Sequence, residues 1–161
     1  MERSLKVLLE PTWDEIEKAR NRTSDFLNAH GLSNDAVQAL TMVVSELIEN
    51  SVKYGRFASP ASKIVVTIDI EEKMTCVEVV NPIDETVYKH LQNLDMTIQW
   101  IRGHQDPFEA YIGRMREISK RPLDDKESGL GLVRISYEGR SIIDFFLGEN
   151  GLLSVSAISN Y

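Results

Sequence analysis

The 161-residue sequence contains a single cysteine and no long hydrophobic run. Because Cys76 is alone, an internal disulfide is excluded, and its alternating apolar surroundings are typical of a strand in the core. No apolar run approaches the roughly 20 residues that a membrane-spanning helix requires. The N-terminal stretch MERSLKVLLEPTWDE returns to charged residues too soon for a signal peptide. We therefore expect a cytoplasmic protein without a membrane segment.

Positive charge is also scarce in this chain. Its 18 lysines and arginines are outnumbered by 25 aspartates and glutamates, which gives a net charge of −7. This acidic balance argues against non-specific binding to nucleic acid or to anionic lipid, but it leaves open a nucleotide in a locally basic pocket. The hydrophobic fraction of 42% and the charged fraction of 27% are ordinary for a globular protein. The length predicts one domain over residues 1–161.

Hydrophobic periodicity predicts alternating strands and helices along the chain. Strands are expected over 4–10, 63–72, 74–81, 141–147 and 152–159, and helices over 13–31, 34–54, 95–101, 107–118 and from 130 onward. Thr12 with Glu15 indicates a capping box at the first helix, and Ser33 can cap the second helix. The order predicts an α+β fold, a two-layer sandwich in which helices cover one face of a mixed sheet. Residues 84–127 form a long helical insert in it.

The stretch SELIENSVKYG, Ser45 to Gly55, places polar residues on an otherwise apolar predicted helix. Glu46 and Asn50 are four residues apart, and Lys53 follows three residues later, so all three share one helix face. Taken alone, this face is more simply interpreted as a solvated surface. The alternative is one wall of a pocket that holds a charged ligand.

A second informative stretch, ESGLGL, has two glycines one residue apart just before a predicted helix. Glycine allows a ligand to approach the backbone closely, and a helix N-terminus attracts anions. The third glycine of a dinucleotide-binding fingerprint and the Gly-Lys-Ser/Thr of a P-loop are both missing. Alone, the motif is equally compatible with a plain turn.

Together, and in this order, the two stretches resemble the Bergerat-fold (GHKL) ATP-binding family. The closest likeness is to the small anti-sigma-factor serine kinases of the RsbW type, and the element order matches over nearly the whole chain. Glu46, Asn50 and the following Lys53 resemble the N box of that family. SGLGLVRI resembles its second glycine box.

The resemblance implies a site for ATP and Mg²⁺. Asn50 would bind the Mg²⁺ that bridges the phosphates, and Glu46 would be the catalytic base that accepts a proton from water or a substrate hydroxyl. Lys53 would lie near the phosphates. The second glycine box would supply the remaining nucleotide-binding residues: Ser128, Gly129, Leu130, Gly131 and Leu132.

The first glycine box of the family, D-x-G-x-G, is replaced here by Asn81-Pro82-Ile83-Asp84. Asn81 stands where the family has the aspartate that binds the adenine amino group, and its side-chain oxygen can still accept a weaker, uncharged hydrogen bond. Ile83 adds bulk where a glycine is expected.

Residues 84–127 take the place of the ATP lid. One face of a predicted helix in this segment carries Phe108, Tyr111 and Met115. This helix either packs on the domain or exposes that face to a partner protein or a second copy.

Two functional hypotheses follow. The first is an ATP-dependent serine/threonine kinase that phosphorylates a small antagonist protein and sequesters a regulator. The second is a non-catalytic partner-switching module on the same fold, with a weakened or lost nucleotide site.

Overall fold

The computed structural model describes residues 2–120 and 130–161. In these ranges the strands are β1 (Ser4–Leu9), β2 (Ile64–Ile70), β3 (Thr75–Pro82), β4 (Ser141–Leu147) and β5 (Leu152–Ser159). The helices are α1 (Trp13–Ala29), α2 (Asn34–Tyr54), α3 (Tyr88–Arg102), α4 (Pro107–Ser119) and α5 (Leu130–Tyr137), with a 3-10 turn at Glu85–Val87.

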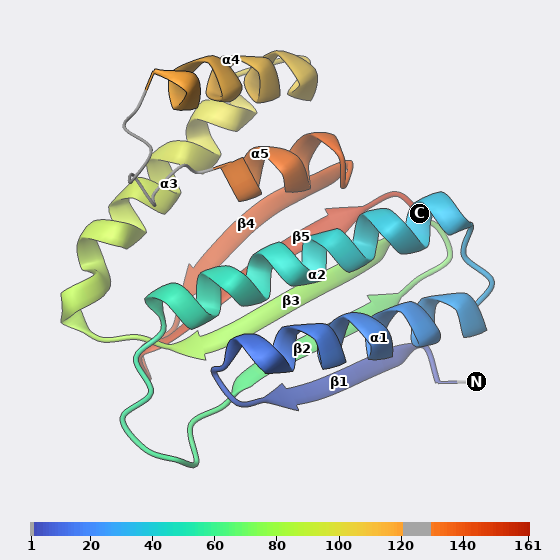
Figure 1. Cartoon of the computed structure of the whole chain (residues 1–161), viewed down its shortest axis with the longest axis horizontal. Coiled ribbons are helices and arrows are strands. Elements are labelled where there is room, and N and C mark those ends of the chain that lie inside the picture. The colour runs from blue at the N-terminus through green and yellow to red at the C-terminus, as the bar shows by residue number, and fades with distance from the viewer. Residues whose placement is uncertain (1, 121–129) are drawn as a thin grey trace.

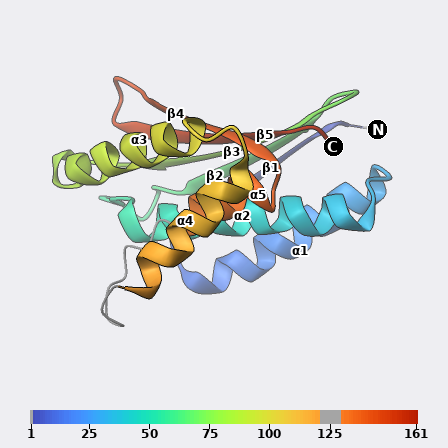
Figure 2. The same ribbon diagram turned by 90° about the horizontal axis from the view of Figure 1, so that it is seen from above.

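The five strands form one sheet in the order β1-β2-β3-β5-β4 (Figure 1). Helices α1 and α2 lie together on one side of it (Figure 2), which confirms the predicted two-layer α+β sandwich. The sheet differs from the prediction in one respect, because all four neighbouring strand pairs are antiparallel and the sheet is not mixed. The reason is that β5 lies between β3 and β4 and is antiparallel to both.

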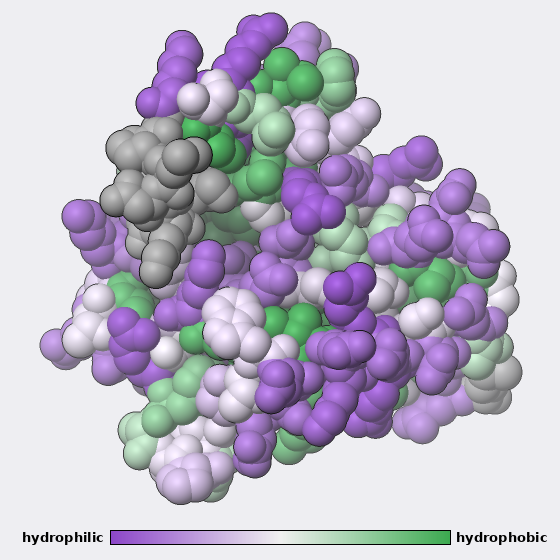
Figure 3. Space-filling view, viewed as in Figure 1, coloured by the Kyte–Doolittle hydropathy of each residue, from purple (hydrophilic) through white to green (hydrophobic). Residues whose placement is uncertain are grey.

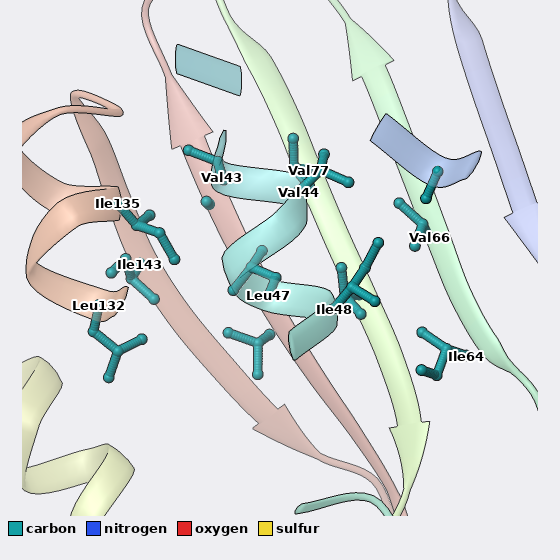
Figure 4. Close-up of a cluster of buried hydrophobic side chains, with 14 of the residues drawn as sticks. Val43, Val44, Leu47, Ile48, Ile64, Val66, Val77, Leu132, Ile135 and Ile143 are labelled. Atoms are coloured by element: carbon teal, nitrogen blue, oxygen red, sulfur yellow. The ribbon is translucent and has the colours of Figure 1, made fainter. Parts of the chain in front are cut away.

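The hydrophobic core lies between the sheet and helix α2. Alternate residues of β2 and β3 point toward the helices and are almost fully buried, as the period of a strand requires. Side chains of α2, α5 and the sheet meet in this layer (Figure 4), including Val43, Val44, Leu47, Ile48, Ile64, Val66, Val77, Leu132, Ile135 and Ile143. The apolar side of α2 is therefore fixed against the sheet, and this fixes the direction of its polar side.

The helix boundaries show where short sequence signals succeed and fail. Ser33 caps α2 as predicted, since its hydroxyl oxygen accepts a hydrogen bond from the Ala36 amide at 3.2 Å. The capping box at α1 is wrong: the Thr12 side chain makes no capping hydrogen bond, and the Glu15 amide bonds the Thr12 carbonyl instead. Helix α3 begins at Tyr88, well before the predicted start at residue 95.

Helices α3 and α4 lie within the predicted insert at 84–127, whose residues 121–127 are outside the described ranges. Both views place α3 beside the β4 edge of the sheet (Figures 1 and 2), where Arg102 Nη2 donates a hydrogen bond of 2.7 Å to the backbone oxygen of Ile143. Helix α4 packs on α5, because the rings of Phe108 and Tyr111 each lie 5.2 Å from the Tyr137 ring.

The surface on the helix side is mixed in character. Hydrophilic side chains dominate over α1 and α2, whereas hydrophobic atoms gather over α4 (Figure 3). Among the helices of residues 2–120 and 130–161, none combines the length and the hydropathy that a membrane crossing requires.

Candidate functional site

The polar face of α2 lies at the border between core and solvent. Glu46 and Asn50 are half-buried, and Lys53 in the last turn is exposed. The intervening Leu47 and Ile48 are fully buried against the sheet. The three predicted residues therefore follow one edge of α2, and Glu46 and Asn50 are the members shielded from water.

Glu46 is tied to α5 by an ion pair. Arg134 Nη1 donates a hydrogen bond of 2.8 Å to Glu46 Oε1, and the Glu46 side chain is only 17% exposed. The same guanidinium donates from Nε to Glu138 Oε2 at 3.0 Å. Arg134 thus links a glutamate of α2 to Glu138, the residue directly after α5, and this holds α5 beside the polar edge of α2.

Gly131 allows the first turn of α5 to approach Glu46 closely. A Cβ atom at this position would overlap Glu46 Oε2, so a side chain here would displace the carboxylate. The second glycine of SGLGL and the glutamate of the N-box-like stretch are therefore in direct contact. The structure brings together two predicted site residues that are 85 positions apart by number.

The environment of Glu46 changes its acidity. Burial raises the pKa of the Glu46 carboxyl above its usual value, and the neighbouring Glu49 raises it further. Arg134 opposes both effects without cancelling them. A carboxylate with a raised pKa is a stronger base, which is the property that a group accepting a proton near neutral pH requires.

Asn50 can serve as a metal ligand. Its side-chain amide is half-buried and forms no hydrogen bond with another residue in the described part of the chain. A side-chain amide oxygen is a hard donor of the type that Mg²⁺ takes, and Mg²⁺ needs few protein ligands because it keeps several waters. The residues present fit a Mg²⁺ ion held jointly with phosphate oxygens, and Lys53 lies one turn further along α2.

Asn81 lies at the far end of the candidate site, on the last part of β3. It is only 3% exposed. Ser51 Oγ donates a hydrogen bond of 2.9 Å to Asn81 Oδ1, and Asn81 Nδ2 donates one of 3.1 Å to the oxygen of Pro82. One lone pair of Oδ1 remains for a ligand. Ile83, in the place of the family glycine, is buried in the core cluster.

The second glycine box is described only in part. Ser128 and Gly129 lie outside the described residues. Leu130 is half-buried and Leu132 is buried, with Gly131 between them in the first turn of α5. Leu130 is the first residue of α5 that the structure describes. Amides near a helix N-terminus stabilise negative charge such as a phosphate group.

Two residues of the site escaped the sequence analysis. Ser51 follows Asn50 directly and orients Asn81. Arg134 is the only charge in the apolar stretch LGLVRIS, and it stands four residues before Glu138, a spacing that indicates an ion pair on a helix. That isolated charge was the available signal for Arg134.

Glu46 and Asn50 lie one turn apart on α2, Glu46 contacts Gly131 in α5, and both helices lie on the same side of an antiparallel sheet, an arrangement that matches a Bergerat-type fold. Residues 9–136 match the family described as the histidine kinase-like ATPase domain. The chain belongs to this family, which confirms the resemblance found in the sequence.

The solved structures that are similar to this chain include two that contain a second protein or domain. A chain in the crystal structure of the SiaB–SiaC complex from Pseudomonas aeruginosa has 20% identity and a TM-score of 0.73, and the match covers 98% of this chain and 90% of that one. The RsbU and RsbW domains of Rv1364c from Mycobacterium tuberculosis give 12% identity and a TM-score of 0.58, with 98% of this chain and 32% of that longer chain covered. No curated protein matches the sequence at a significant level.

Proposed function

We propose that this protein binds Mg·ATP between the polar edge of α2, the end of β3 and the start of α5, and that it regulates a small partner protein by partner switching. The observation that carries the proposal is the contact between Glu46 and the first turn of α5, where Gly131 leaves room for the carboxylate. This contact supports the proposal because a helix N-terminus near Glu46 would favour a phosphate group beside the candidate base.

Each residue of the site would have a distinct role. Asn50 would hold the metal ion, Asn81 would accept a hydrogen bond from the adenine amino group, and Glu46 would take the proton of a substrate hydroxyl. Bound Mg·ATP would supply the phosphoryl group for transfer. Since phosphoryl transfer depends mainly on positioning and on charge stabilisation, these few groups suffice.

The partner is proposed to be a small antagonist-like regulatory protein. Two of the similar solved structures are a complex of SiaB with SiaC and a protein that joins RsbU and RsbW domains. In both, the fold occurs together with a second protein or domain. We propose the same arrangement here, in a cytoplasmic regulator of one domain whose insert at 84–127 acts as the lid.

A second candidate function is a non-catalytic partner-switching module. Two observations favour it: Glu46 is engaged by Arg134, and the oxygen of Asn81 is engaged by Ser51. In this alternative the same residues hold helices and sheet together, and the nucleotide affinity is weak or absent.

Calorimetric titration with ATP, in the presence and absence of Mg²⁺, separates the two functions. Because a ligand stabilises the folded state by RT ln(1 + [L]/Kd), millimolar Mg·ATP should also raise the melting temperature. Asn50→Ala should abolish the part of the effect that requires Mg²⁺, while the exposed Asn93→Ala on α3 should leave it intact. If neither ATP nor ADP produces heat or a thermal shift, the nucleotide proposal is wrong and the binding module remains.

A further inference from the structure

A cavity of about 470 Å³ lies between α3, the turn that follows it, the end of α5 and strand β4. This volume is in the range of small-molecule sites, about 300–1,000 Å³. Its lining includes none of the candidate nucleotide residues Glu46, Asn50, Asn81 and Gly131. The cavity is therefore a separate feature, located where the insert meets the edge of the sheet.

The floor of the cavity is apolar. Ile98, Ile101 and Ile143 line it and are at most 8% exposed. Ile142 also lines it and is 68% exposed, as is Phe146 of the same strand at 71%. An apolar floor with one exposed isoleucine at its border offers hydrophobic surface to a ligand.

The charged groups of the lining are two arginines and one aspartate, in a protein whose net charge is −7. The aspartate, Asp106, caps α4, because its Oδ1 accepts a hydrogen bond from the Phe108 amide at 3.0 Å. Its negative charge remains in the lining, where the two arginines outnumber it. Arg102 donates to the Ile143 oxygen and lies 3.7 Å from Asp144 Oδ1. No hydrogen bond or ion pair joins Arg140 to another residue of the described ranges. Its charge acts on the Tyr161 phenol, where it opposes the burial that raises the pKa of that group.

The backbone of Arg140 is strained. Its φ of 48° is the one positive value found at a non-glycine residue among the described residues. A residue with a side chain rarely adopts this conformation, and such strain concentrates at ligand-binding and other functional positions. Glycine would fit here without strain, yet the sequence places an arginine at the wall of a cavity.

We propose that this cavity binds a small amphipathic anion, with the anionic group at Arg140 and Arg102 and an apolar body on the isoleucine floor. The arginines would select the anionic group of the ligand, and the isoleucines would select its apolar body. A neutral or cationic molecule of the same shape would lack the interaction with Arg140.

The fluorescent anion 1-anilinonaphthalene-8-sulfonate tests the proposal, because it carries a sulfonate on an apolar aromatic body. We expect binding with a stoichiometry of one, displaced by decanoate but not by decyltrimethylammonium, and unaffected by saturating Mg·ATP. Displacement by the cation would overturn the proposed charge selectivity. Displacement by Mg·ATP, or the lack of any binding, would overturn the site itself.

Two variants locate the binding. Ile142→Glu places a negative charge at the border of the cavity and should weaken sulfonate affinity by about tenfold or more, whereas Phe146→Glu is a matched control. Phe146 is on the same face of β4, is 71% exposed and lies outside the lining. Equal losses in the two variants would contradict the assignment.

Arg140→Gly removes the guanidinium while keeping the backbone conformation that glycine adopts freely. It should weaken binding of the sulfonate without unfolding the protein, as judged by circular dichroism. Arg140→Lys should restore part of the affinity because it returns the charge. Wild-type affinity in Arg140→Gly would refute the role of this residue.

Discussion

Replacing Asn81 by aspartate tests how the end of β3 is held to α2. The wild-type amide accepts a hydrogen bond from Ser51 Oγ through Oδ1 and donates one to the Pro82 oxygen through Nδ2. Aspartate keeps the first of these bonds. Its second oxygen, however, would face the Pro82 carbonyl at about the present 3.1 Å, so a donor–acceptor pair becomes a pair of acceptors.

The expected magnitude follows from the burial of this side chain, which is 3% exposed. Losing a hydrogen bond to a buried acceptor costs about 1–3 kcal/mol of unfolding free energy. The buried charge adds to this cost, and the protein reduces it by raising the pKa of the new carboxyl. At pH 7.5 we expect a total destabilisation of about 2–4 kcal/mol, since each unit of pKa shift corresponds to about 1.4 kcal/mol.

The stability of Asn81→Asp should also depend on pH in a defined direction. A carboxyl whose pKa is higher in the folded state binds protons more tightly there than in the unfolded chain. When protonated, it can donate to the Pro82 oxygen and restore the lost bond. The variant should therefore be closest to wild type at about pH 4, near the unfolded aspartate pKa of about 3.9, and should lose stability as the pH rises through its folded pKa.

Urea denaturation of wild type, Asn81→Asp and Asn50→Asp at pH 4 and pH 7.5 provides the measurement. Asn50 is the matched control, because its half-buried amide has no hydrogen bond to another described residue. Its substitution should cost less than about 1 kcal/mol. If Asn81→Asp is no less stable than Asn50→Asp, or if its stability does not depend on pH, the hydrogen-bonding role assigned to Asn81 is refuted.

Four further outcomes are expected. Glu46→Gln should keep ATP affinity while lowering phosphate transfer to a partner by roughly 10²–10⁴; unchanged transfer would exclude Glu46 as the base. In the wild type, transfer should rise with pH as Glu46 loses its proton, with a midpoint above the ordinary glutamate value because burial raises this pKa. Gly131→Ala should weaken Mg·ATP binding, since the new Cβ would displace Glu46, whereas Gly103→Ala should not, because its nearest neighbour would lie at 3.4 Å. Asn81→Asp should increase the preference for ATP over GTP by about 1–2 kcal/mol, as calorimetry with both nucleotides would show; equal responses would place the base elsewhere.

Local signals predicted most of the fold. The residue Ser33 and the periodic apolar residues after it place α2 within a residue of its observed bounds, because capping and amphipathic spacing are properties of neighbouring residues. The start of α3 was missed since Tyr88 to Asn93 carry only a weak apolar pattern in sequence. The antiparallel direction of the whole sheet also could not be predicted, because it depends on where β5 inserts rather than on any strand's own residues.

In the candidate site, too, residues with a local signal were predicted and residues that depend on long-range contacts were missed. Glu46 and Asn50 were found through their spacing on one helix. Arg134 and Ser51 were missed because their partners lie 88 and 30 residues away, at Glu46 and Asn81. Such contacts arise only when α5 and β3 pack beside α2, and short-range patterns contain no information about that packing.

The two functional hypotheses require different properties of the Glu46 carboxylate. Its Oε1 accepts a hydrogen bond from Arg134, while its Oε2 lies against Gly131 at the start of α5. If Glu46 has only a structural role, its side chain needs only to accept the hydrogen bond from Arg134. The amide oxygen of glutamine could accept that bond. As a base, it needs a second oxygen that can take a proton, and only a carboxylate provides that. Because glutamine preserves the contact and removes the basicity, the chemistry of Oε2 rather than the presence of the ion pair decides between a kinase and a binding module.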